Sequence, residues 1–161
     1  MTTPVDAKPN SDRELVLCRI IDAPRSKVWA AWSDPEKLKQ WWAPRPWATP
    51  IAEYELRSGG SSRIVMEGPA GERFDQPGVF LEVVPGEKVV FTDAYEKPWV
   101  HREKAFMTAV LTFEDAGAGK TKYTARISHP TVADREQHEQ MGFEGGWGIC
   151  ADQIEEVAQQ S

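Results

Sequence analysis

The sequence lacks the features that mark several common protein classes. Its two cysteines, Cys18 and Cys150, stand far apart without a CxxC spacing, and we expect both to be reduced thiols in the core. No apolar run approaches the roughly 18 residues of a membrane-spanning helix. The polar N-terminus has no signal-peptide core. We therefore expect a cytoplasmic protein without a membrane partner.

The sequence is also poor in basic stretches and in catalytic motifs. The net charge is −6, and the short basic runs are interrupted by acidic or apolar residues, so we expect no nucleic-acid partner. There is no Gly-rich phosphate loop, no GxSxG and no Cys–His arrangement, and no cofactor is predicted. His129 and His138 have no metal-ligand spacing, so no metal site is predicted either.

What is present fits one ordinary domain of 161 residues. Residues 1–12 read as a flexible tail, and 13–160 as a single domain. Residues 14–21 are apolar and β-branched and predict a first strand. Val28, Trp29 and Trp32 then form an apolar helical face, and Ser33-Asp34-Pro35 separates two short helices over 25–32 and 36–42.

From residue 51 to 128 the apolar residues recur with a period of two, which predicts a meander of six strands. The inward-facing set includes Tyr54, Met66, Phe91 and Met107. After Pro130 the period returns to 3.6, and Phe143, Trp147, Ala151 and Ile154 fall on one stripe of a long helix. Four glycines in that helix indicate a kink or a close approach of another backbone.

These elements predict an α+β fold in which a curved seven-stranded antiparallel sheet wraps around one long C-terminal helix. That helix is the only long apolar stripe able to cover the sheet. A helix laid across a strongly twisted sheet touches it along only part of its length, and the remainder can leave a pocket.

Several segments together resemble one known family. They are Ala23 to Arg25, Val28-Trp29, Ala31-Trp32, Asp34 to Glu36, Leu38, Trp41-Trp42, Gly78 to Pro85, Leu111 to Glu114, and Glu144 to Trp147 with Asp152 and Ile154. This pattern resembles the activator of heat-shock protein 90 ATPase homologue family, a branch of the START-like, helix-grip superfamily. The resemblance covers about residues 13 to 160.

The resemblance implies a helix-grip fold, but it carries over no catalytic constellation. In the eukaryotic activators the domain follows another one that makes much of the chaperone contact, and this sequence has no counterpart of it. One residue departs from the family pattern. Ala151 stands where a leucine is common, and the smaller side chain implies a larger cavity.

The candidate ligand-binding residues come from both walls of the expected pocket. They are Trp41, Tyr54, Met66, Phe91, Asp93, Trp99, Met107, Phe143, Trp147 and Ala151. Four of them have a structural alternative: Trp41 or its neighbour Trp42 can plug a corner, and Trp147 can be plain core. Asp93 can bond the loop that follows its strand, and Trp99 can anchor the long 95–104 connection.

The sequence is compatible with three functions. The first is binding of a small hydrophobic or aromatic molecule, by a monomer or homodimer, in a cavity between the sheet and the C-terminal helix. The second, implied by the resemblance, is a chaperone-linked or stress-response interaction module. The third is cyclase- or hydrolase-like catalysis, for which Asp93 and Tyr54 are the available polar candidates.

Overall fold

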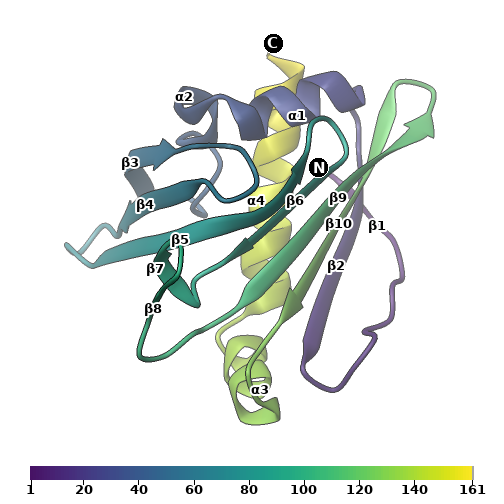
Figure 1. Ribbon diagram of the computed structural model, residues 1–161. Coiled ribbons are helices and arrows are strands. Elements are labelled where there is room, and N and C mark those ends of the chain that lie inside the picture. Colours follow the sequence, from purple (N-terminus) through teal and green to yellow (C-terminus); the bar gives the residue numbers. More distant parts are fainter. Residues whose placement is uncertain (161) are drawn as a thin grey trace.

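A computed structural model describes residues 1–160, and its main feature is an eight-stranded antiparallel sheet curved around a C-terminal helix (Figure 1). The strand order is β1-β2-β10-β9-β6-β5-β4-β3. The strands are β1 (Thr3–Pro4), β2 (Glu14–Ile21), β3 (Ala48–Tyr54), β4 (Ser61–Glu67), β5 (Arg73–Val84), β6 (Lys88–Thr92), β9 (Thr108–Gly117) and β10 (Lys120–Ser128). The helix-grip fold predicted from the sequence is confirmed.

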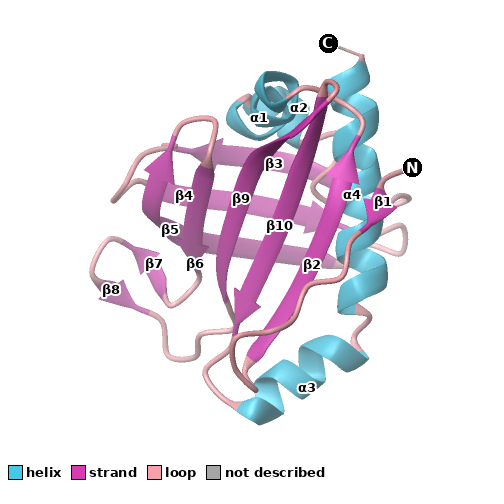
Figure 2. Cartoon of the chain, turned by 90° about the vertical axis from the view of Figure 1, so that its right-hand side faces the viewer, coloured by secondary structure: helices cyan, strands magenta, loops and turns pink. Residues whose placement is uncertain are grey.

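Four helices complete the chain: α1 (Arg25–Ser33), α2 (Pro35–Leu38), α3 (Val132–Gln140) and α4 (Phe143–Gln159). Figure 2 shows α4 running along one side of the sheet, with α1 and α2 at one end and α3 at the other. Asp34 accepts a hydrogen bond from the Glu36 N–H, and Pro35 occupies the first turn, which explains why α2 begins there. Thr131 caps α3 through the Asp134 N–H in the same way.

The eighth strand is the one that sequence periodicity did not predict. Thr3–Pro4 pairs with Arg19 and Ile20 of β2, although residues 1–12 were expected to form a flexible tail. The Thr2 N–H also donates to Asp152 of α4 at 2.7 Å. Because backbone and polar contacts hold this segment, its sequence carries no apolar alternation that could have predicted it.

Two helix predictions need correction. The long C-terminal helix is interrupted at Gly142, whose φ of 91° lies in the left-handed region that glycine adopts most readily. α3 and α4 are therefore separate helices. The second short helix ends at Leu38, so Trp41 and Trp42 lie in the turns that follow it.

The connection over residues 95–104 contains a small hairpin of its own, β7 (Tyr95–Lys97) and β8 (Val100–His101). Trp99 sits at its turn with a φ of 66° and is largely exposed. This hairpin is not part of the main sheet.

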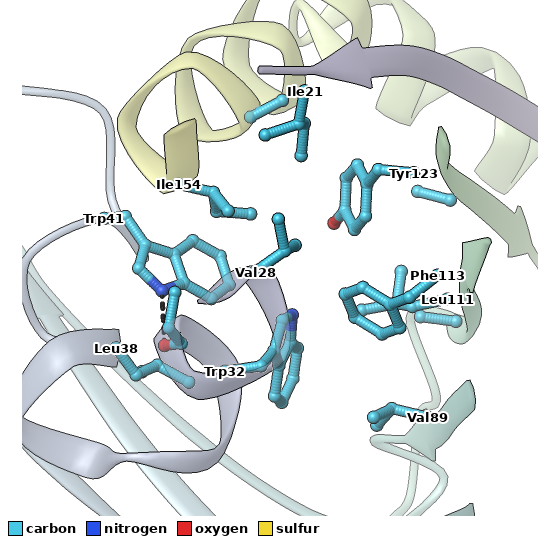
Figure 3. Close-up of a cluster of buried hydrophobic side chains, with 14 of the residues drawn as sticks. Ile21, Val28, Trp32, Leu38, Trp41, Val89, Leu111, Phe113, Tyr123 and Ile154 are labelled. Atoms are coloured by element: carbon cyan, nitrogen blue, oxygen red, sulfur yellow. Dashed lines mark hydrogen bonds between the residues drawn. The ribbon is translucent and has the colours of Figure 1, made fainter. Parts of the chain in front are cut away.

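The hydrophobic core lies where α1 and the C-terminal half of α4 meet the sheet. Figure 3 shows Val28 and Trp32 of α1 facing Ile154 of α4 and Tyr123 of β10. Ile154 and Val28 are fully buried. This end of the clasp is filled with side chains.

Candidate functional site

A cavity of about 390 Å³ lies at the other end of the clasp, between the sheet and the N-terminal half of α4. The volume falls within the range of small-molecule sites. Most of its lining is apolar, supplied by β4, β5, β6, the segment before β9, the Trp41-Trp42 corner, and α4. Binding pockets of this kind combine an apolar wall with a few polar groups.

Among the glycines inside α4, Gly146 borders this space. Gly146 lines the cavity, and a Cβ added at Gly145 or Gly146 would meet no atom within 4 Å. Gly148 differs, because its added Cβ would come within 3.0 Å of the Arg19 guanidinium. The kink that the sequence indicated occurs at Gly142, whereas Gly145 and Gly146 lie inside a continuous helix.

Aromatic rings form much of the cavity wall. Trp42 lies 5.7 Å from Trp32 and 6.1 Å from Phe91, measured between ring centroids. On α4, the rings of Phe143 and Trp147 lie 5.5 Å apart, and both line the cavity. Such surfaces suit a flat apolar molecule, since offset and edge-to-face ring contacts add to the gain from burial.

The Trp41-Trp42 corner combines structural and lining roles. The Trp41 indole N–H donates to the Ala31 carbonyl at 2.8 Å, the dashed line in Figure 3, and the ring is buried. Trp41 therefore plugs the corner while one part of it reaches the cavity wall. The Trp42 indole N–H donates to Gln76 Oε1 at 3.2 Å, across the cavity lining.

Asp93 lies at the cavity wall but is engaged in the loop that follows its strand. Its Oδ1 accepts the N–H groups of Phe106 and Met107 at 2.8 and 3.0 Å. Its Oδ2 lies 3.8 Å from the Arg102 guanidinium. Asp93 therefore bonds the loop that follows its strand, the structural alternative to ligand binding, and it holds the chain just before β9.

Tyr54 lies outside the cavity lining. Its hydroxyl donates to the Trp32 carbonyl at 2.7 Å, and burial, followed by the nearby Asp34 charge, raises its pKa above the ordinary value. Asp93 and Tyr54, the candidates for an acid–base pair, are thus not brought together in the cavity.

Seven of the ten residues predicted from the sequence do line the cavity: Trp41, Met66, Phe91, Asp93, Met107, Phe143 and Trp147. The other three do not. Ala151 is fully buried in the packed core, so its small side chain does not enlarge the cavity as expected, and Trp99 is exposed at the hairpin turn. Tyr54 has the predicted inward parity but packs on Phe80 and Trp32 instead.

The cavity has two polar features that the sequence did not reveal. Trp32 and Tyr123 both belong to the cavity lining, and the buried Trp32 Nε1 has no hydrogen-bond partner of normal geometry. Burial raises the pKa of Tyr123. At the α3 end the wall includes His138, whose ring is paired with His129. Tyr123 and His138 belong to no motif recognised in the sequence, and only the folded chain brings them to the cavity.

Both cysteines are free thiols, as expected. Cys150 lines the cavity, and burial raises the pKa of its thiol to about 12, so it stays protonated at neutral pH. Within residues 1–160 no three His, Cys, Asp or Glu side chains gather in a way that suits a metal ion. In the same range no helix has the length and apolar character needed to cross a membrane.

Comparison with known proteins places the chain in a family. The family model described as "Activator of Hsp90 ATPase homolog 1-like protein" matches residues 22–159. The chain belongs to this family. The match includes the Trp41-Trp42 corner, every strand from β3 to β10, and all of α4, so the cavity lies within the family domain. The resemblance noted in the sequence is confirmed.

Solved structures agree with this assignment. A crystal structure of a protein from Nitrosomonas europaea is 36% identical, with a TM-score of 0.89, covering 94% of this chain and 97% of that one. A crystal structure of a Mycobacterium smegmatis protein is 25% identical, with a TM-score of 0.78 and 96% of each chain covered. A solution structure of an Arthrobacter aurescens protein shares the fold at 22% identity and a TM-score of 0.80, covering 96% of this chain and 91% of that one. No curated protein matches the chain.

Proposed function

We propose that this protein binds a small hydrophobic or aromatic molecule in the cavity between the sheet and α4. The observation that carries the proposal is the aromatic, largely apolar lining of a cavity of about 390 Å³ beside Gly146, where no side chain fills the space. A cytoplasmic location and the absence of a nucleic-acid or membrane partner, expected from the sequence, belong to the same proposal.

The physical driving force is burial of apolar surface. Each Å² of apolar area removed from water contributes roughly 25 cal/mol, and a ligand filling the cavity would cover area on its own surface and on the wall. Phe91, Trp42 and Trp147 come from three separate segments, so a flat ring between them would be contacted from several sides.

The decisive test fills the cavity from α4. In Gly146→Leu the new side chain enters the open space, whereas in Gly145→Leu it grows from the adjacent residue, which does not line the cavity. Both changes remove a helical glycine, so they match in backbone effect. Titration with naphthalene, followed by tryptophan fluorescence, should show binding that Gly146→Leu weakens at least about tenfold and Gly145→Leu leaves intact.

Native mass spectrometry of freshly purified protein provides a second readout. A co-purifying small molecule should be present in the unsubstituted protein and in Gly145→Leu, and absent in Gly146→Leu. Equal naphthalene affinity in the two variants, or no binding to the unsubstituted protein, would contradict the proposal.

Family membership favours a second candidate, a chaperone-linked or stress-response interaction module. The exposed Trp99 and Val100 at the β7–β8 turn offer the kind of apolar contact such a role needs. Purified protein and its Trp99→Ser variant can be compared for binding to Hsp90 by surface plasmon resonance. Binding that the variant weakens supports this candidate, and no binding at all, where a known co-chaperone binds, counts against it.

A further inference from the structure

A chain of two hydrogen bonds fixes the proton positions on the histidine pair at the α3 end of the cavity. His129 Nδ1 lies 2.8 Å from the Arg13 carbonyl oxygen, which can only accept, so this nitrogen carries a proton. In a neutral imidazole the other nitrogen, Nε2, is then an acceptor. It lies 2.9 Å from His138 Nδ1, which must therefore be the donor. His138 Nε2 is left with a free lone pair.

The surroundings of the pair favour its neutral form. Both rings are buried, and aromatic rings lie close to His138: the centroid of the Phe106 ring is 4.7 Å and that of the Phe143 ring 5.2 Å away. In the part of the chain that the structure describes, neither histidine forms a hydrogen bond or ion pair with a carboxylate. Burying a charge without such a partner is unfavourable.

His138 belongs to the cavity wall, together with Phe106, Met141 and Phe143. Its Nε2 has no hydrogen-bond partner among residues 1–160. It is not one of the side-chain atoms that lack a partner and are also fully inaccessible to solvent, which among these residues are Trp32 Nε1 and Thr49 Oγ1. Asp93 Oδ1 and the Trp42 indole N–H in the same wall are engaged, and Trp32 Nε1, which also has no partner of normal geometry, is a donor and not an acceptor. His138 Nε2 is thus a free hydrogen-bond acceptor on a ring whose tautomer is fixed, and aromatic rings lie beside it.

We propose that the molecule held in the cavity is neutral and carries a hydroxyl group, on or next to an aromatic ring, that donates a hydrogen bond to His138 Nε2. The inference rests on the proposed binding function and adds the chemical class of the ligand. His129 acts as a positioning residue, because its Nε2 holds the proton on His138 Nδ1 and so keeps the opposite nitrogen free to accept.

Three probes of one shape test the idea: 2-naphthol, 2-methoxynaphthalene and 2-naphthoate. Only the first is a neutral donor. The unsubstituted protein should bind 2-naphthol about five- to tenfold more tightly than the methyl ether, the preference that one net hydrogen bond supplies. In His138→Phe, which keeps a ring but no acceptor, the two affinities should become equal. His101→Phe, a change at an exposed histidine outside the cavity, should keep the preference.

The outcomes separate this inference from the function beneath it. Equal binding of 2-naphthol and its ether by the unsubstituted protein, or a preference that survives in His138→Phe, overturns the hydroxyl assignment while leaving cavity binding intact. Tighter binding of 2-naphthoate than of 2-naphthol also overturns it, because Arg102 in the wall would then be the polar anchor. Failure of all three probes contradicts both proposals.

A measurement without ligand checks the proton positions directly. The chain has three histidines, so long-range ¹H–¹⁵N spectra can assign each ring. His129 and His138 should both show a protonated Nδ1 and an unprotonated Nε2, and the Nε2 resonance of His138 should move when 2-naphthol is added. A protonated Nε2 on His138 would overturn the proposal whatever the probes show.

Discussion

The two halves of helix α4 face the same curved sheet but pack against it differently. In the C-terminal half, Ile154 and Ala151 are fully buried against α1 and the sheet. In the N-terminal half, Gly146 and Trp147 face a cavity of about 390 Å³. Both halves belong to one continuous helix, so the difference arises from side-chain volume and from what stands opposite.

This contrast assigns stability and function to separate parts of one element. Close packing gives the C-terminal half most of its stabilising contacts, because dispersion contacts and apolar burial both grow as voids vanish. In the other half Gly146 contributes less helix propensity and fewer contacts than a larger residue would, and it leaves space beside the helix. The fold can keep a cavity at one end because close packing at the other end supplies the stability.

The largest effect should come from opening a void in the packed half. Ile154→Ala should lower the free energy of unfolding by about 3–4 kcal/mol, because it removes a fully buried side chain. Ile149→Ala, on the exposed face of the same helix, should cost less than about 1 kcal/mol. Urea denaturation of both variants measures the difference, and equal losses would contradict the division of α4 into two halves.

A polar contact of the packed half should rank next. Buried Gln153 donates to the carbonyls of Trp41 and Ala43 and accepts the Arg45 N–H. Gln153→Leu should lower stability by about 3 kcal/mol, because it leaves backbone groups of the Trp41–Arg45 corner without partners. Gln159→Leu, which removes one exposed hydrogen bond to Asp22, is the matched control. A loss below about 1 kcal/mol for Gln153→Leu would show that water replaces these bonds.

The third effect is the pH dependence of stability that His138 causes at the cavity end of the molecule. Burial, and then the neighbouring His129, lower the pKa of His138 from 6.5 to about 4. Between these values the unfolded chain binds a proton at His138 that the folded chain does not, so stability falls as the pH falls. The loss between pH 6.5 and 5 should be roughly 1.5 kcal/mol. Urea denaturation at both pH values should show a smaller loss for His138→Phe, and an unchanged loss would contradict the assignment.

The smallest effect should be a gain. Gly145→Ala and Gly146→Ala should each raise stability by up to about 1 kcal/mol, since the added methyl group meets no atom within 4 Å and the helix gains propensity. Gly148→Ala should gain less, because its methyl group would displace the Arg19 side chain. Thermal unfolding of the three variants tests this order. A loss of stability in Gly146→Ala would contradict the prediction that the added methyl group enters open space.

The regular part of the fold was predictable because its signals are local. The apolar run over residues 14–21 coincides with β2, and period-two alternation identified the six strands of the meander. The same parity placed Met66, Phe91 and Met107 on the inner face, where they line the cavity. Parity gives the face of a sheet but not the position along it, which is why Tyr54 also faces inward yet lies away from the cavity.

Periodicity within a few residues was enough to predict the strands, the inner face of the sheet and the apolar stripe of α4, and the resemblance to the family added the helix-grip fold. The folded chain alone shows that the helix breaks at Gly142, that Ala151 belongs to the packed end, and that Gln153 bonds the tryptophan corner. It also decided the pairing of His129 with His138. Most of these features are contacts between residues far apart in the sequence, and no local pattern predicts which distant side chains will meet.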